Sequence, residues 1–302
     1  MTKARETQGF RLGGSTGLLT WALTGALLLA PAACGAAPSW RVSLTGQPAD
    51  IPAHEDCYSG RSDAAAQNAR NLDTLAIAPF HRSEAGWAVY EPLVAREAAT
   101  ACAAATPGFA KALGHWQRTH GLAPTGVLDA TTLSGVMLVW QHRRGFVIAS
   151  AHGCPPGADE ASLSLVPARN SYAGKTLGLI PPALAAYQAM MAAARAEVPA
   201  IAHDPRLLTI FSAYRSPDAD AARCAAENNC QGVVRTTCSA HRTGTAMDLF
   251  LGAAAGYGPD SSADSNRLYI SRGPAYRWMA RNAGRFGFAP YPFEPWHWEW
   301  NG

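Results

Sequence analysis

The chain has 302 residues, a length that suits two domains of about 150 residues each. Hydrophobic residues make up 48% of it, which is ample for a packed core and argues against a disordered chain. The net charge is only +3, and removal of residues 1–34 leaves 22 basic and 21 acidic residues, a net charge of +1. A basic patch for nucleic acid is therefore not indicated, and we expect no nucleic-acid partner. No stretch after residue 34 is long and apolar enough for a polytopic membrane protein.

The N-terminus has the anatomy of a secretory signal. Lys3, Arg5 and Arg11 precede an apolar run over residues 18–30, and small residues follow over 31–37. A charged region, an apolar region and a small-residue cleavage zone in this order predict export to the periplasm or cell envelope. An N-terminal membrane anchor is the alternative.

The signal peptide is predicted to span residues 1–34. Its end, Ala-Ala-Cys34, resembles the end of a bacterial lipoprotein cleavage box, although Pro31 stands where that box usually has Leu. Lipidation of Cys34 is therefore an open alternative, and it would give the only membrane attachment that we expect.

The cysteines predict disulfides. Without Cys34, six of the seven remain, and an even number in an exported chain indicates three disulfides, although six cysteines allow 15 connectivities. A cysteine zinc site is the alternative, but the chain contains no Cys-x-x-Cys pair. The pairs that we predict are Cys57–Cys102, Cys154–Cys238 and Cys224–Cys230.

The first half of the exported chain is predicted to hold a small all-α domain. Residues 35–82 read as a linker or cap, because Pro, Gly and Ser occur early in them without sustained periodicity. The pattern over 83–145 is helical, with Phe109, Leu113 and Trp116 on one face at spacings of four and three.

A turn and a second helix follow. Gly121 can end the first helix, and Asp129 can cap the next. Trp116-Gln117 and the stretch 121–133 together resemble the signature of the small helical peptidoglycan-binding domain. A helix–turn–helix core alone also explains these residues, so glycan binding is implied only by the resemblance.

The rest of the chain predicts a linker over 146–174 and a second domain over 175–302. Helices packed on a small, mostly antiparallel sheet form the simplest architecture for the element order, so we predict an α+β fold. The predicted helices are 181–198, 219–228 and 274–286, the strands are 207–212 and 245–251, and 291–300 is an extended segment.

Potential metal ligands gather in two short segments of this domain. His241 and Asp248 lie in Ser-Ala-His-Arg-Thr-Gly-Thr-Ala-Met-Asp, and Glu294 and His297 lie in Glu-Pro-Trp-His-Trp-Glu near the C-terminus. A catalytic zinc ion needs about three ligands from His and carboxylate residues, and one position open to water. We therefore predict one zinc ion per chain, held by His241, Asp248 and His297.

Strand alternation supports this geometry. His297 and Glu299 share one face of the terminal strand, and the three flanking tryptophans share the other. Gly244 lets the chain turn between His241 and the strand of Asp248. A carboxylate in an apolar strand is costly unless it is paired or binds a metal.

These segments, with Tyr-Arg-Ser over 214–216, resemble the zinc D-Ala-D-Ala carboxypeptidases of the VanY type. That group of cell-wall metallopeptidases shares a fold with lysostaphin and the Sonic hedgehog signalling domain, and the resemblance covers about 175–302. It implies that Glu294 is the catalytic base and that Arg215 anchors the substrate or stabilises the oxyanion. The further substrate-binding residues that it implies are Tyr214, Ser239 and Trp296.

The chain departs from the family pattern at three places. Asp220 stands where the family often has Gln, Arg242 stands where a neutral residue is common, and Cys224–Cys230 lies in an insertion. A structural ion pair of Arg215 with Asp218 or Asp220 is the alternative to a role in substrate binding.

The resemblance implies an enzyme that hydrolyses peptidoglycan stem peptides. In this mechanism Glu294 assists the attack of zinc-bound water on a peptide carbonyl. A monomeric D-alanyl-D-alanine carboxypeptidase is the expectation. The alternatives are an L,D-carboxypeptidase, a peptidoglycan endopeptidase, or a wall-binding module that keeps zinc without turnover.

Overall fold

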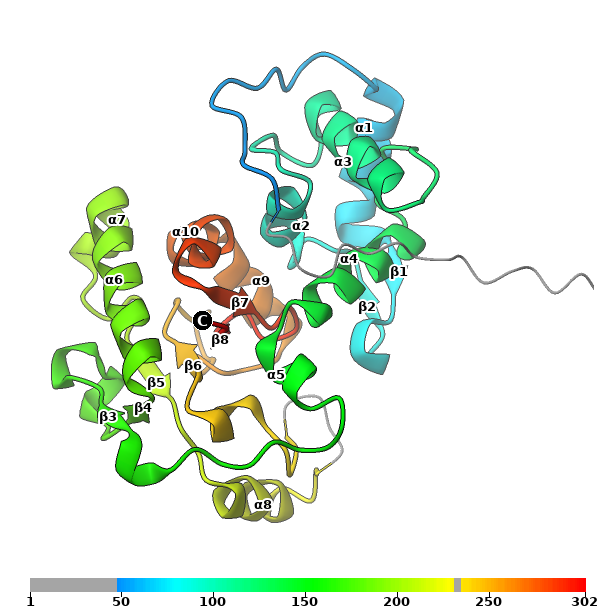
Figure 1. Ribbon diagram of the computed structural model, residues 1–302. Helices are drawn as coiled ribbons and strands as arrows, with labels where there is room; N and C mark the ends of the chain where they lie inside the picture. Colours follow the sequence, from blue (N-terminus) through cyan, green and yellow to red (C-terminus); the bar gives the residue numbers. More distant parts are fainter. Residues whose placement is uncertain (1–47, 231–234) are drawn as a thin grey trace, which may run out of the picture. The chain divides into compact units, whose positions relative to one another are not determined.

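The computed structural model describes residues 48–230 and 235–302 (Figure 1). The predicted signal peptide and the possible lipidation site at Cys34 lie outside the described residues. Within the described ranges, no helix combines the length and the hydropathy that a membrane span requires.

The first part of the described chain, residues 62–149, is termed the helical region. Its short β1 and β2 form an antiparallel pair. The elements are α1 (Ser62–Thr74), β1 (Ala76–Ile77), β2 (Glu84–Ala85), α2 (Glu91–Glu97), α3 (Pro107–Thr119), α4 (Ala130–His142) and α5 (Gly145–Ala149).

The two predicted helices of this region, α3 and α4, each begin after a residue whose side chain caps the helix N-terminus. The side chain of Thr106 accepts the N–H of Phe109 at the start of α3, and Asp129 accepts the N–H of Thr132, at 2.7 Å, at the start of α4. Phe109, Leu113 and Trp116 are buried on one face of α3, as predicted. α3 ends at Thr119, and Gly121 follows it with a φ of +75°.

Helix α1 lies in the stretch that we expected to be a linker or cap. It packs there through buried amides: Asn68 donates to the Gly126 carbonyl at 2.8 Å, and Asn71 donates to the Leu128 carbonyl at 2.9 Å. An apolar pattern cannot reveal such a helix, because polar side chains make its tertiary contacts. The domain boundaries themselves remain a prediction.

The second part, residues 164–302, is termed the sheet region. Its four-stranded antiparallel sheet has the order β5-β6-β8-β7, and Figure 1 shows β6, β8 and β7 beside one another. The strands are β3 (Ser164–Leu165), β4 (Gly178–Leu179), β5 (Ile210–Ser212), β6 (Ala246–Leu249), β7 (Phe288–Pro290) and β8 (His297–Trp300). The helices are α6 (Pro181–Glu197), α7 (Pro199–His203), α8 (Pro217–Ala226), α9 (Asp264–Arg272) and α10 (Pro274–Asn282). The fold is α+β, as predicted.

Several features of the sheet region differ from expectation, and β3, β4, β7 and α7 lie outside the predicted helices and strands. The segment predicted as extended over 291–300 forms a strand only from His297, and the residues before it make the turn that joins β7 to β8. Helix α9 has no counterpart among the predicted elements. Its buried residues include Asn266, Arg267 and Ser271, so the apolar periodicity that marks a helix is missing.

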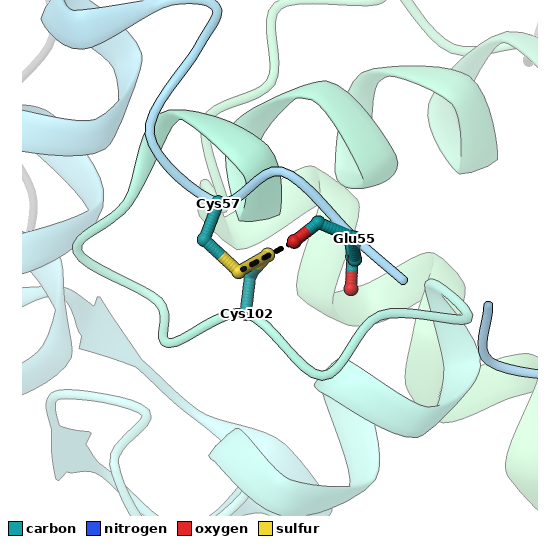
Figure 2. Close-up of side chains that lie close together, drawn as sticks. All are labelled: Glu55, Cys57 and Cys102. Atoms are coloured by element: carbon teal, nitrogen blue, oxygen red, sulfur yellow. Dashed lines mark hydrogen bonds between the residues drawn. A yellow bond between two sulfur atoms is a disulfide. The ribbon is translucent and has the colours of Figure 1, made fainter. Parts of the chain in front are cut away.

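All three predicted disulfides are present: Cys57–Cys102, Cys154–Cys238 and Cys224–Cys230. Figure 2 shows the first of them beside Glu55, whose carboxylate accepts the N–H of Ala101 at 2.8 Å. Cys57, Cys102 and Glu55 have the spacing of a metal site. Since the metal-binding form of cysteine is the thiolate, the disulfide makes this cluster structural rather than metal-binding.

Candidate metal centre

Antiparallel pairing of β6 with β8 brings the predicted ligands together. The register places Asp248 directly opposite His297, so their side chains meet on one face of the sheet. His241 precedes β6 in a 3₁₀ turn, Ala240–Thr243. Gly244 ends this turn with a φ of +68°, a conformation that glycine adopts without steric cost, and the chain reverses there as predicted.

The donor atoms of His241, Asp248 and His297, termed the ligand triad, lie within 4.8 Å of one another. His297 Nδ1 is 2.9 Å from Asp248 Oδ1, and His241 Nε2 is 3.2 Å from Asp248 Oδ2. The three residues are buried, with exposed fractions of 4%, 7% and 4% in chain order. A buried carboxylate between two imidazoles needs a compensating positive charge.

Hydrogen bonds behind the triad orient both imidazoles. His241 Nδ1 is 2.7 Å from the Ala213 carbonyl, which can only accept, so this nitrogen carries the hydrogen. Similarly, His297 Nε2 is 3.2 Å from Glu299 Oε1, a carboxylate oxygen. The nitrogens that face Asp248 are therefore His241 Nε2 and His297 Nδ1, and each can present a lone pair to a metal.

The electrostatics of the triad favour a cation. Burial lowers the pKa of His241. Burial acts in the same direction on His297, but hydrogen bonds to Asp248 and Glu299 outweigh it and raise the pKa to about 9. Burial raises the pKa of Asp248, but the two histidines outweigh it and bring this pKa well below its usual value. Two imidazoles and one carboxylate are a usual ligand set of catalytic zinc, so the residues present fit this ion.

The triad lies in a cleft of about 150 Å³ that Glu294 also lines. Glu294 belongs to the turn between β7 and β8, where its N–H donates to the Tyr291 carbonyl and its carbonyl accepts the N–H of His297. Burial in the cleft, supported by the charge of Asp248, raises the pKa of Glu294 to about 7. A carboxyl group with a pKa near neutrality can take up and release protons at physiological pH.

Arg215 lines the same cleft and forms the ion pair that we considered as its alternative role. Its Nη1 donates to Asp220 Oδ1 at 3.1 Å, and its Nη2 donates to Ser212 Oγ at 3.4 Å. Asp220, which is buried, also accepts the hydroxyl of Ser239 at 2.7 and 2.8 Å. Asp220, which stands where the family often has Gln, therefore holds Arg215 and Ser239 in place.

The remaining predicted residues divide into two groups. Ser239 and Trp296 line the cleft, whereas Tyr214 is not among its lining residues. The Tyr214 hydroxyl donates instead to the Ala158 carbonyl at 3.3 Å and to Glu160 at 3.4 Å.

Arg242, a departure from the family pattern, supports the loop of His241. Its guanidinium contacts Cys154 Sγ at 2.6 Å and donates to the Thr237 carbonyl at 2.7 Å. It therefore braces the disulfide Cys154–Cys238, which ends just before Ser239.

No role was predicted for Glu299, which contacts His297, or for Arg144 and Arg223, which line the cleft. Alternation in β8 placed Glu299 beside His297 and could have indicated its contact. Arg144 and Arg223 line the cleft from the helical region and from α8. Among the residues that the structure describes, none forms a hydrogen bond or ion pair with the guanidinium of Arg223.

Comparisons with known proteins find little. No protein-family model matches the chain, and no curated protein matches it. Among solved structures, the chain is similar to LdcB, an LD-carboxypeptidase whose structure is described as revealing the molecular basis of peptidoglycan recognition. The identity is 22%, the alignment covers 50% of this chain and 73% of LdcB, and the TM-score is 0.36. At this level of similarity, the side chains of the site have to carry the functional argument.

Proposed function

We propose that the protein is a zinc-dependent peptidase that hydrolyses peptidoglycan stem peptides, as a D-alanyl-D-alanine carboxypeptidase. The observation that carries this proposal is one cleft that holds three converging metal donors and Glu294. The ligand triad binds one zinc ion per chain, and Glu294, which is not part of the triad, is the catalytic base. Structural zinc sites use four protein ligands, whereas a set of three leaves a position for chemistry.

The residues of the cleft have separate roles in this reaction. Zinc supplies a Lewis acid that polarises the peptide carbonyl and lowers the pKa of water to about 7. Glu294 takes a proton from the attacking water and returns it to the leaving amine. Arg215, held in place by Asp220, donates to the oxyanion that forms on the carbonyl oxygen.

The charge of the cleft indicates the substrate class. Four arginines line it, and the only lining residues with acidic side chains are Asp248, Asp260 and Glu294. The guanidinium of Arg223 has no hydrogen-bond or ion-pair partner among the described residues, so it is available for a substrate carboxylate. A stem peptide that ends in D-Ala-D-Ala places a free carboxylate next to the bond to be cut. Ser239 and Trp296 form the walls beside it.

The location of the protein agrees with this substrate. Three disulfides indicate an oxidising, extracytoplasmic compartment, and the periplasm or cell envelope is where peptidoglycan peptides occur. The helical region, with its resemblance to a peptidoglycan-binding domain, contributes binding to the wall.

Product analysis tests the proposal. The purified protein is incubated with a stem pentapeptide ending in D-Ala-D-Ala and with the corresponding tetrapeptide, and the products are identified by mass spectrometry. Loss of one alanine from the pentapeptide alone supports the D,D-carboxypeptidase. Loss of alanine from the tetrapeptide identifies an L,D-carboxypeptidase, and cleavage within the stem or cross-bridge identifies an endopeptidase. Intact peptides that bind without turnover would favour the wall-binding module.

A further inference from the structure

Arg144 of the helical region contacts the support of a predicted zinc ligand. It follows α4, and its guanidinium forms an ion pair with Glu299 in β8, where Arg144 Nε lies 3.0 Å from Glu299 Oε1. The same carboxylate oxygen accepts from His297 Nε2 at 3.2 Å. Glu299 therefore bridges Arg144 and His297.

A second contact connects Arg144 to the same imidazole through the ring of Tyr291. The guanidinium carbon lies 4.3 Å from the centre of the Tyr291 ring, and the Tyr291 and His297 rings meet edge to face at 5.9 Å. Arg144 thus reaches His297 along two routes, one through a carboxylate and one through an aromatic ring.

The backbone beside Arg144 is fastened to the end of the same strand. Asn301 donates to the Arg143 carbonyl at 2.6 Å and accepts the N–H of Gly145 at 2.8 Å. Because these bonds lie on both sides of Arg144, its Cα is held in place next to β8. The side chain needs no rearrangement to meet Glu299.

The ion pair between Arg144 and Glu299 is buried, so its loss would be costly. Glu299 is 1% exposed and Arg144 is 8% exposed, and Glu299 Oε2 has no hydrogen-bond partner in the described structure. A buried carboxylate that loses its cationic partner is strongly disfavoured, so Arg144 determines whether Glu299 keeps its position beside His297. A metal-ligating histidine usually depends on such a carboxylate for its ring orientation and basicity.

A second buried arginine connects the helical region to the other end of this segment. Arg267 of α9 donates to Glu84 at 2.8 Å and to the Tyr90 hydroxyl at 2.7 Å, and its Nε donates to the Phe293 carbonyl at 2.8 Å. Phe293 directly precedes Glu294. The segment that carries Glu294 and His297 is therefore braced from the helical region at both ends.

We propose that Arg144 is a positioning residue of the metal centre: through Glu299 it holds the imidazole of His297 in the orientation that binds zinc. This inference rests on the zinc site of the proposed function. It gives the helical region a task besides wall binding, since one of its arginines sets the metal affinity of the sheet region.

Zinc affinity of the full chain tests this relay without any substrate. The dissociation constant is measured by competition with a chromogenic chelator for the wild type, Arg144→Gln, Glu299→Gln and the double variant. Loss of such an outer partner typically weakens metal binding by about 10- to 100-fold. We expect this loss in each single variant and little further loss in the double variant, because both substitutions break the same relay.

Arg143→Gln is the matched control. Arg143 is the neighbouring residue and also forms an ion pair, with the buried Glu97, but within the described residues its side chain forms no hydrogen bond or ion pair with the triad or with Glu299. It should lower the thermal stability and leave the zinc affinity within about twofold of the wild type. Equal loss of affinity in Arg143→Gln would reduce Arg144 to a general stabilising residue and overturn the proposal.

The absorption spectrum of the Co²⁺-loaded chain adds a readout of ligand geometry. Arg144→Gln should change the visible absorption bands of Co²⁺, because these bands depend on the number and geometry of the ligands. Arg144→Lys keeps the charge but loses the planar fork, so it should recover part of the affinity and decides the question if Arg144→Gln does not fold. Wild-type affinity in Arg144→Gln or in Glu299→Gln would refute the relay. A wild-type chain that binds no zinc would instead overturn the proposed function itself.

Discussion

Each imidazole of the ligand triad is held through one ring nitrogen by an outer partner, and its other ring nitrogen faces Asp248. The Ala213 carbonyl accepts from His241, Glu299 accepts from His297, and both carboxylate oxygens of Asp248 face the imidazoles. The sequence indicated the triad because spacing and strand alternation are local properties. It could not indicate the Ala213 carbonyl, since every residue has a carbonyl and only the fold selects one.

In the proposed mechanism, Glu294 takes part in the chemical step and not in metal binding. Glu294→Gln keeps the size and polarity of the side chain but removes the base. It should retain the zinc content of the wild type and lose about 10²- to 10⁴-fold in kcat on a stem pentapeptide, the usual effect of removing a general base. Metal analysis and steady-state kinetics on one preparation check both statements. Turnover at the wild-type rate would assign the base to another residue.

Arg223 and Arg215 should respond differently to substitution. Arg223→Ala is expected to lower kcat/KM on a peptide with a free C-terminus by about 10- to 150-fold, the value of a hydrogen bond to a charged group, and to leave an amidated peptide unaffected. Arg215→Ala should reduce activity on both peptides and destabilise the fold, because it removes the nearer of the two arginines that pair with the buried Asp220. If Arg223→Ala fails to distinguish the two peptides, the carboxylate subsite lies elsewhere.

At the scale of elements, local signals predicted the helices whose buried faces are apolar. α3 and α6 followed from periodicity and terminal residues, and α4 followed from its cap at Asp129. α1 and α9 were missed because buried amides and Arg267 make their contacts. Polar contacts of this kind are specified by partners far along the chain, such as Glu84 for Arg267, and leave no periodic trace in the sequence.

The N-cap of α4 allows a quantitative test of how much one local interaction stabilises the fold. Asp129→Ala removes the acceptor of the Thr132 N–H and should lower the free energy of unfolding by about 1 kcal/mol. Urea denaturation followed by circular dichroism measures it. Ser134→Ala, on the exposed side of the same helix, is the control and should change stability by less than about 0.5 kcal/mol. Equal effects would show that the cap contributes nothing specific.

At the scale of the molecule, the structure joins regions that the sequence separates. Arg144 and Glu299 are 155 residues apart, and neither shows from its neighbours that the other is its partner. The disulfide pairing was predictable only in part, because the domain division supported Cys57–Cys102 and no such argument selected the other two pairs. The contact between the helical region and the catalytic segment was not, since it depends on two buried arginines that resemble surface residues in the sequence.

The central claim is that one zinc ion in the ligand triad drives hydrolysis of a stem peptide. The most direct measurement strips the purified full chain with a chelator, removes the chelator, and titrates Zn²⁺ back while the release of D-alanine from a pentapeptide is followed. Activity should be absent from the stripped chain, rise linearly and saturate at one equivalent of zinc, whereas His297→Ala should stay inactive throughout the titration. Undiminished activity in the stripped chain, or a fully loaded chain that releases no product from any stem peptide, would contradict the account.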